Sequence, residues 1–402
     1  MQRTRIRVQR AHARRIERRS ARRFWAGRHP VAAGTIVVVL ALTPVWVSLS
    51  SAVTNPSLGA SVPARFAEWL RDHGGSSVVV WAENEWYSHH PPPVGGRPPN
   101  GAIPLPPTKT GSGSATGSGS YLPEPKPIKP LASPPIAGEG QWHAAGRLVN
   151  GVPAVYEAFL RPDAVHTSLV VGVAWMDTKL LRATLYSGSY IPGGGPYTYT
   201  APVQPSAATS LVAAFNAGFR MADANGGYYT DGKMIMPLRT DGASVVIYKN
   251  GTVTVGAWGR EVHMTSDVVS VRQNLSLLVD NGKPVAGLNA NDTTVWGATL
   301  GNQVYVWRSG LGETAKGALV YVGGPGLNIT TLAELLARAG SVRALELDIN
   351  TDWVDYATFA PSTPHGTASP ANGHNLLPHM VGTPARYFAS WWARDFFIMS
   401  AR

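Results

Sequence analysis

Early in the chain, an unbroken run of 23 uncharged residues extends from Val31 to Val53. As an α-helix rising about 1.5 Å per residue, this run is long enough to cross a bilayer core of about 30 Å. Eleven arginines and one glutamate precede it in residues 1–29. The positive-inside rule therefore predicts a cytoplasmic tail over 1–30, a transmembrane helix over 31–53 and an extracytoplasmic remainder, which makes a single-pass protein of the cell membrane.

A cleaved signal peptide is the alternative, because small residues at positions 50–52 resemble a cleavage site. The long basic prefix favours a retained anchor. In both cases the bulk of the chain is exported.

The basic charge belongs to the prefix and not to the rest of the protein. Residues 1–29 carry +10 of the total formal charge of +11. The remainder is close to neutral, so we expect no nucleic-acid partner, and we expect the prefix to contact anionic lipid. The chain has no cysteine, which excludes disulfides, zinc–thiolate sites, iron–sulfur clusters and thiol nucleophiles.

Beyond the span, composition changes twice. Residues 54–88 read as a short membrane-proximal α/β segment, with a helix over 62–73 and a strand over 77–87. Residues 89–140 are rich in proline, glycine and serine, which predicts a linker or stalk. Residues 141–402 form the remaining domain.

This last domain is rich in short β signals separated by turn dipeptides, and an Asn250-Gly251 hairpin is the clearest of them. Helices are expected over 207–215 and over 330–339, the second capped by Thr330 or Thr331. The pattern predicts an α+β fold, with a mixed β-sheet and a few helices. Strands are expected over 167–175, 180–187, 243–249, 252–255, 302–307 and 318–322.

Several motifs of this domain resemble the phosphodiester glycosidase family. The segment Phe215-Asn-Ala-Gly-Phe219 is similar to the family's Asn-Gly-Gly-Phe-Phe signature. Leu278 to Lys283 resembles its Asn-Gly-Lys segment, and Thr294 to Gly297 stands where the family has Arg-Thr-Ala-Ile-Gly. The helix and strand from Gly326 to Asp348 match those that end in Asn-Leu-Asp-Gly-Gly-Gly-Ser-Ser. The resemblance implies an α+β domain and hydrolysis of a sugar phosphodiester.

The same alignment shows departures. The family's glycine-rich loop is replaced here by Asp348-Ile-Asn-Thr-Asp-Trp353, and its strand asparagine is Glu346. Its Arg-Thr pair has become Thr293-Thr294. Since glycines let a backbone approach a phosphate or sugar closely, the fold carries over more strongly than the substrate.

Alternation along the strand 344–350 places Glu346, Asp348 and Asn350 on one face. Two carboxylates about 7 Å apart can divide into acid and base, as hydrolysis of a glycosidic bond requires. Pairing with Arg343 or Arg386 is the structural alternative. Asn350 and Asp352 would line the pocket. We expect no cofactor or metal, although alternate oxygen ligands at 348, 350 and 352 leave a calcium ion open.

A second group of candidates surrounds Asn216. Its amide can both donate and accept, and Gly218 permits close approach of a ligand. Arg220 and Arg239 can clamp a phosphate or carboxylate, while surface salt bridges are the alternative for each. Thr293 and Thr294 complete the expected substrate-binding set by resemblance.

Together these features predict a membrane-anchored hydrolase that acts on a glycan or sugar phosphodiester of the cell envelope. Asp348 and Glu346 are the expected catalytic carboxylates. The alternative is a non-catalytic envelope-binding or scaffolding protein that retains the fold. Clustering of Asp348, Asn216 and Arg239 around one cleft would favour the enzyme. The sequence leaves the sugar, its linkage and the oligomeric state open.

Overall fold

The computed structural model describes residues 30–105, 121–288 and 305–402. The chain divides into two compact units, residues 1–55 and 56–402. The first contains α2 (Pro30–Thr54), with Pro44 inside it. Its part Val37–Thr54 is long and apolar enough to span a membrane, which is consistent with an anchor or a signal sequence.

The second unit begins with a pair of short helices. A 3-10 turn, η1 (Pro56–Leu58), precedes α3 (Val62–Asp72) and α4 (Ser76–His89). The Ser61 side chain caps α3 by accepting a hydrogen bond from the Ala64 N–H. The strand expected over 77–87 is wrong, because this segment is helical. Its three consecutive valines favour a strand locally, but an ion pair between Arg71 and Glu83 fastens the segment to α3 as a second helix.

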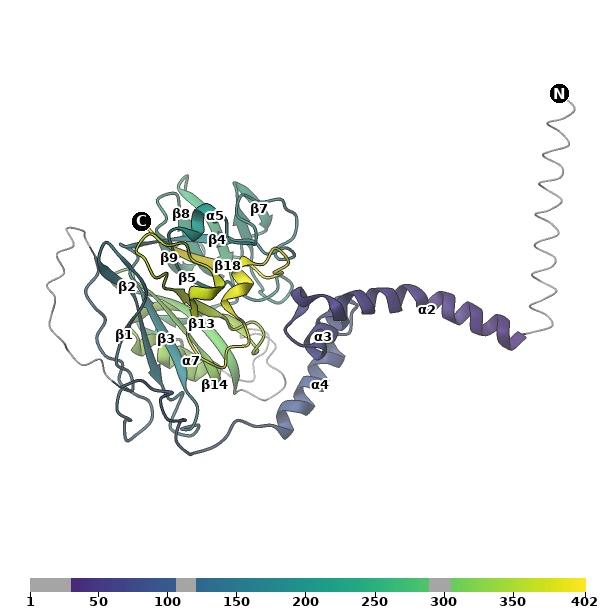
Figure 1. Ribbon diagram of the computed structural model, residues 1–402, viewed down its shortest axis with the longest axis horizontal. Coiled ribbons are helices and arrows are strands. Elements are labelled where there is room, and N and C mark those ends of the chain that lie inside the picture. Colours follow the sequence, from purple (N-terminus) through teal and green to yellow (C-terminus); the bar gives the residue numbers. More distant parts are fainter. Residues whose placement is uncertain (1–29, 106–120, 289–304) are drawn as a thin grey trace, which may run out of the picture. The chain divides into compact units, whose positions relative to one another are not determined.

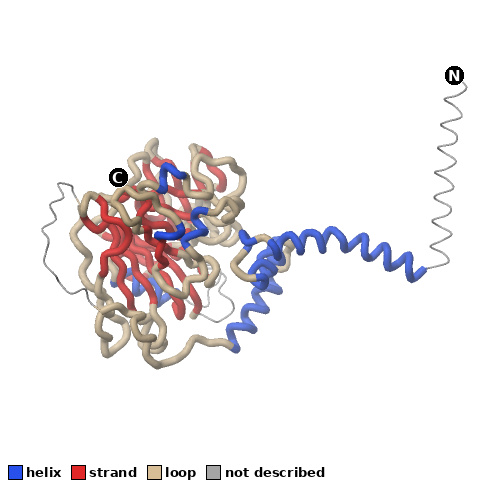
Figure 2. Tube along the Cα trace, in the orientation of Figure 1, coloured by secondary structure: helices blue, strands red, loops and turns tan. Residues whose placement is uncertain are grey.

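The described strands of this unit form three antiparallel sheets (Figures 1 and 2). In spatial order, the eight-stranded sheet contains β1 (His143–Val149), β2 (Val152–Leu160), β3 (Val171–Met176), β14 (Leu319–Leu327), β13 (Val306–Thr314), β15 (Ser341–Ile349), β11 (Leu277–Asp280) and β12 (Lys283–Pro284). The β5 sheet contains β17 (Gly373–Asn375), β16 (Tyr356–Phe359), β5 (Leu211–Asn216), β18 (Phe396–Ala401) and β4 (Leu181–Tyr186). The β8 sheet contains β7 (Lys233–Met236), β6 (Tyr228–Thr230), β10 (Val268–Gln273), β8 (Ala243–Tyr248) and β9 (Val253–Ala257).

The main hydrophobic core lies where these sheets face one another. It combines side chains from all three sheets, such as Leu345 of β15, Phe215 of β5 and Val245 of β8. A second core lies between the eight-stranded sheet and α7 (Ile329–Arg338), which contacts β14 and β15. The expected cap, Thr330 or Thr331, is wrong: Asn328 is the N-cap, and Thr331 at the third helical position completes a reciprocal pair of hydrogen bonds with it. The expected α+β class with few helices is confirmed.

The helix expected over 207–215 is wrong in most of its length. A four-residue helix, α5 (Pro205–Ala208), is followed directly by β5. All six residues of β5 are buried, because the strand lies between β16 and β18 in the interior of its sheet. A strand covered on both faces reads as a continuous apolar run, which periodicity cannot distinguish from a buried helix.

The expectation of a free linker from 89 to 140 is wrong for residues 121–140, which pack on the domain. Leu122 and Ile128 belong to the core beneath α7, and the Leu122 N–H donates to Asp177 at 2.7 Å. Arg161 forms a buried ion pair with Glu139. Much of this proline-rich segment is therefore part of the folded domain. Residues 106–120 lie outside the described part of the chain.

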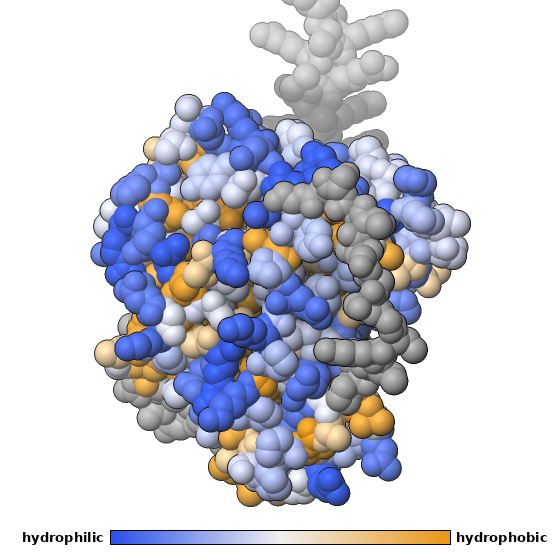
Figure 3. Space-filling view, turned by 90° about the vertical axis from the view of Figure 1, so that its left-hand side faces the viewer, coloured by the Kyte–Doolittle hydropathy of each residue, from blue (hydrophilic) through white to orange (hydrophobic). Residues whose placement is uncertain are grey.

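The C-terminal third contains the short 3-10 turns η2 (Pro370–Asn372) and η3 (Pro384–Phe388). The hairpin at Asn250-Gly251 is confirmed, because β8 pairs with β9 on either side of it. On the face shown in Figure 3, hydrophilic and hydrophobic residues are interspersed.

Candidate functional site

The ends of three strands bring the candidate residues together. Asn216 ends β5, and its partner across the sheet is Phe396, the first residue of β18. Arg394 and Asp395 directly precede that strand and so lie beside the end of β5. Asp348 joins them from β15 of the other sheet, and the same small cavity is lined by Asn216, Asp348, Arg394 and Asp395.

A β-bulge turns Asp348 toward this point. Arg308 of β13 pairs with Ile349, whereas Gly310 pairs with Glu346, so one residue of β13 opposes two of β15. The extra residue reverses the alternation of side chains beyond it. Glu346 and Ile349 consequently share a face, and Asp348 lies on the opposite one. The expectation that Glu346 and Asp348 stand on one face is therefore wrong.

Asp348 is almost completely buried, with 3% of its surface exposed. Its Oδ1 accepts a hydrogen bond from the Ile349 N–H at 2.8 Å, and its Oδ2 lies 4.0 Å from Nη1 of Arg394. Burial raises the pKa of this carboxyl group to about 8, against the opposing effect of Arg394. At neutral pH the group therefore retains a proton, which suits a general acid.

Glu346 has a different environment, in which an arginine balances the charge of its carboxylate. Its side chain is fully buried and forms an ion pair with Arg308. Burial raises its pKa to about 7, and Arg308 opposes that shift. It lines none of the cavities that contain Asp348. The structure thus separates the two carboxylates that the strand pattern places together.

The side chain of Asn216 links the two sheets beneath the cavity. Its Nδ2 donates to Ser309 Oγ at 3.0 Å, and its Oδ1 accepts from the hydroxyl of Tyr321 at 3.1 Å. Ser309 Oγ in turn accepts from the Asp348 N–H at 3.2 Å. The hydroxyl of Ser309 therefore connects Asn216 to Asp348, and this connection positions the backbone of Asp348.

Arg394 is the main residue that the sequence analysis missed. It is 7% exposed, and its guanidinium lies over the ring of Trp353 at 4.1 Å. Its buried Nη1 has no hydrogen-bond partner among the described residues. The signal in the sequence is a pair of opposite charges, Arg394-Asp395, between two tryptophans and an apolar strand. Asp395 forms a buried ion pair with Arg272.

The arginines expected to bind an anion differ in their placement. Arg220 lines the cavity, whereas Arg239 donates to the backbone carbonyls of Asn225 and Leu275 and lines none of the cavities at Asp348. Arg239 therefore does not cluster with Asp348 and Asn216. A Cβ on Gly218 would lie 3.1 Å from the Arg272 guanidinium, so this glycine is needed for close packing of that group.

The loop after β15 is held by its own hydrogen bonds. Asn350 has a positive φ of 88°, and its Oδ1 accepts from the Asp352 N–H at 3.0 Å. Oδ1 of Asp352 accepts from the Ala60 N–H at 2.8 Å. No group of three or more His, Asp or Glu residues placed to hold a metal occurs in the described ranges. Thr293 and Thr294 lie outside those ranges.

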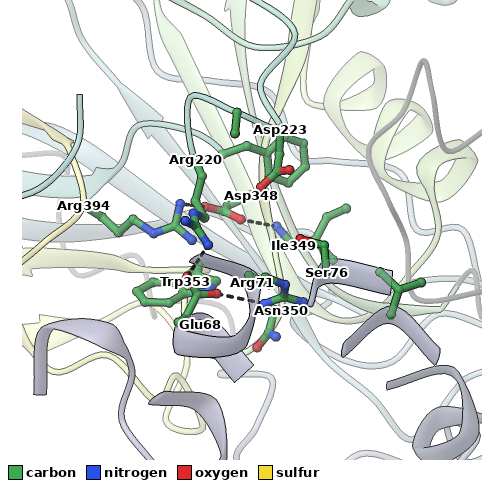
Figure 4. Close-up of a pocket in the computed structure, with 13 residues that line it drawn as sticks. Glu68, Arg71, Ser76, Arg220, Asp223, Asp348, Ile349, Asn350, Trp353 and Arg394 are labelled. Carbon is green, nitrogen blue, oxygen red and sulfur yellow. Dashed lines mark hydrogen bonds and ion pairs between the residues drawn. The ribbon is translucent and has the colours of Figure 1, made fainter. Parts of the chain in front are cut away.

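These residues surround a cavity of about 220 Å³ (Figure 4). Asp348, Asn350 and Trp353 line it from the domain, and Glu68 and Arg71 line it from α3. Figure 4 shows the side chains of Arg220 and Arg394 directed into it. A buried, protonated carboxyl group can protonate a leaving oxygen, and an arginine whose Nη1 has no hydrogen-bond partner in the described ranges can stabilise negative charge.

Comparison with known proteins finds one matching family model. Residues 209–348 match the model of the phosphodiester glycosidase family, NAGPA. The zebrafish N-acetylglucosamine-1-phosphodiester alpha-N-acetylglucosaminidase catalytic domain, solved in a form auto-inhibited by its pro-peptide, is 17% identical, with a TM-score of 0.39. That comparison covers 65% of this chain and 88% of the zebrafish chain.

A hypothetical protein from Synechocystis is 14% identical over 58% of this chain and 59% of its own, with a TM-score of 0.28. No curated protein matches the chain significantly. The family match spans the strand that ends at Asn216 and reaches Asp348. Residues 209–348 are therefore similar to the phosphodiester glycosidase family.

Proposed function

We propose that this chain is a membrane-anchored hydrolase that cleaves a sugar phosphodiester or glycosidic linkage of the cell envelope outside the cytoplasm. The observation that carries the proposal is Asp348, a carboxyl group with a pKa of about 8 in a cavity beside Arg394. The family match at 209–348 supports the reaction class. The apolar helix α2 and the arginine-rich prefix support the anchor and its orientation.

In the proposed reaction, Asp348 gives its proton to the leaving oxygen as the bond from that oxygen to the anomeric carbon breaks. Water then adds to the anomeric carbon and returns a proton to Asp348. Arg394 stabilises negative charge on the leaving group, which matters most where that group is a phosphate. Asn216 holds Asp348 in position through Ser309.

The proposal assigns Glu346 no contact with substrate, because its ion pair with Arg308 lies away from the cavity. Arg239 likewise keeps a structural place in the loop at Asn225. Arg220 and Asn350 remain proposed pocket residues. Asp352 lines none of the cavities at Asp348, and its carboxylate accepts from the Ala60 N–H instead. We propose no cofactor.

The test is Asp348→Asn in the full-length protein, assayed against envelope glycan fractions and a synthetic hexose-1-phosphodiester. We expect the rate to fall by about 10²–10⁴-fold, which is typical of losing general acid catalysis. The melting temperature should stay close to that of the wild type, because the amide replaces a carboxyl group that is already uncharged at neutral pH. Thermal melting and turnover are measured on the same sample.

Asp280→Asn is the matched control, since Asp280 pairs with Arg260 near the surface and lines none of the cavities at Asp348. It should keep full activity. An Asp348→Asn protein with wild-type turnover would contradict the acid assignment. A wild-type protein that binds these glycans without cleaving them would favour the alternative, a non-catalytic envelope-binding protein.

A further inference from the structure

Helix α4 has two sides with different surroundings. One side is made by residues at the spacing i, i+3, i+4 and i+7, which are Ser76, Val79, Val80 and Glu83. Ser76 and Val80 line the cavity of Figure 4, and Val79 is buried. Glu83 binds Arg71 of α3 at 2.6 Å. This side therefore faces the rest of the domain.

The opposite side of α4 is exposed and carries large apolar side chains. It begins at Val78 and continues at i+3, i+4 and i+8 with Trp81, Ala82 and Trp86. Val78 is 53% exposed, Trp81 65% and Trp86 62%. Among the described residues of the second unit, no other tryptophan is as exposed. Two such rings on one side of a helix form an apolar patch, which marks a surface that contacts a membrane or another molecule.

The mixture of side chains on this side matches a lipid–water interface. Tryptophan combines a large apolar ring with one N–H donor, and it is enriched where proteins pass from the bilayer into water. Two polar residues, Glu85 and His89, also lie on this side, 3.7 Å apart near the C-terminal end of the helix. The hydrocarbon core would exclude such groups, whereas the headgroup layer accommodates them beside apolar rings.

The chain also keeps α4 close to the apolar helix α2. Residues 55–75 connect the two, and residues 62–72 of this connection are α3. Helix α3 rises about 16 Å and the remaining residues extend at most about 36 Å, so α4 begins within about 50 Å of the end of α2. With α2 in a bilayer, so short a tether gives α4 an effective concentration at the membrane in the millimolar range. A weak interfacial contact is then sufficient.

We propose that the side of α4 with Val78, Trp81 and Trp86 lies in the headgroup layer of the extracytoplasmic leaflet and seats the domain on the membrane. The inference rests on the proposed function in taking α2 to be a retained anchor. Because Ser76 and Val80 on the opposite side line the cavity, the cavity lies about one helix diameter, 10–12 Å, from the headgroups. The site is therefore placed to reach substrates attached to the membrane.

The absence of cysteine lets a single label report on this side of α4. In the full-length protein in phosphatidylcholine vesicles, Ala82→Cys is labelled with a nitroxide, since Ala82 is exposed between the two tryptophans. Electron paramagnetic resonance measures collisions of the nitroxide with oxygen, which concentrates in lipid, and with a nickel chelate, which stays in water. We expect frequent collisions with oxygen and few with the chelate. Leu148→Cys, at a 55% exposed position of β1, is the matched control and should collide freely with the chelate.

Further variants change the tryptophans in the Ala82→Cys background. Trp81→Gln/Trp86→Gln should return the label to water and raise its collision rate with the chelate to that of the Leu148 control. Trp81→Tyr/Trp86→Tyr should keep the label in lipid, because tyrosine shares the interfacial preference of tryptophan. Trp81→Gln alone serves as the milder variant if the double change lowers the melting temperature.

A label at position 82 that meets the chelate as often as the Leu148 control would overturn the inference. A label shielded from both reagents would overturn it as well, because such a label lies against protein, either a second copy or another part of the chain. A native chain that begins near residue 53 would contradict the anchor of the proposed function, while the full-length chain in vesicles would still report on α4. An anchored, active enzyme whose label faces water would contradict this inference alone.

Discussion

Glu346 and Asp348 are two residues apart on one strand and are buried to nearly the same degree, yet they have opposite surroundings. Glu346 lies against Arg308 in a closed ion pair. Asp348 faces a cavity, and the nearest nitrogen of Arg394 is 4.0 Å from it. The bulge between them makes the difference, because it turns one carboxylate into the interior and the other into the cavity. Burial raises the pKa of both, but only one is placed to exchange its proton with a ligand.

The largest effect that tests this contrast is expected from Glu346→Gln. The change leaves Arg308 buried without its counter-charge, and breaking a buried pair in this way typically costs about 3–5 kcal/mol of stability. Urea unfolding of the variant measures the loss. The double variant Glu346→Met/Arg308→Met removes both charges and should recover most of it. A single variant as stable as the wild type would contradict the closed ion pair.

The next prediction concerns pH. If Asp348 acts in its protonated form, kcat/KM should hold below about pH 8 and fall above it, since its pKa is about 8 in the free protein. Arg394 favours the ionised form, so Arg394→Gln should lower the rate and move the alkaline limb to higher pH. A pH–rate profile of each protein measures this. A limb that stays in place without Arg394 would mean that another group titrates there.

The smallest effect is expected at Arg239, which belongs neither to the Glu346–Arg308 ion pair nor to the cavity at Asp348. Its guanidinium donates to two backbone carbonyls, so Arg239→Gln should cost about 1–3 kcal/mol of stability through the acceptors left unpaired. The kcat/KM of the folded fraction should match that of the wild type. A large fall in kcat/KM without a loss of stability would instead restore Arg239 to the binding site.

The sequence predicts Asp348 and Asn216 as candidates because both lie in motifs that resemble a known family, although it expects a helix and not a strand before Asn216. It does not predict the bulge, since the extra residue appears only in the pairing of β15 with β13, and strict alternation then places Glu346 on the wrong face. The sequence does not predict Arg394 as a site residue, for a related reason. Its contact with Asp348 depends on the pairing of β5 with β18, and these strands are far apart in sequence.

Helices and turns with local signals are predicted more accurately. The periodicity of 330–339 predicts α7, although its cap is Asn328 and not Thr330 or Thr331, and Asn250-Gly251 predicts the hairpin. The strand expected over 77–87 fails because a contact with α3 outweighs the preference of its valines. Residues 121–140 look like a spacer by composition, yet a few apolar side chains such as Ile128 are enough to fasten them to the core.

The position of β18 also dictates when the site can come into existence. This strand lies between β5 and β4 and is their shared neighbour, and Arg394 immediately precedes it. During synthesis β4 and β5 emerge long before β18. Until β18 has been made, each of the two strands has an unpaired edge, which is prone to aggregation. Such late closure between distant segments is slow. A nascent chain therefore has Asn216 and Asp348 but no Arg394, and it acquires a complete pocket only when its last strand is inserted.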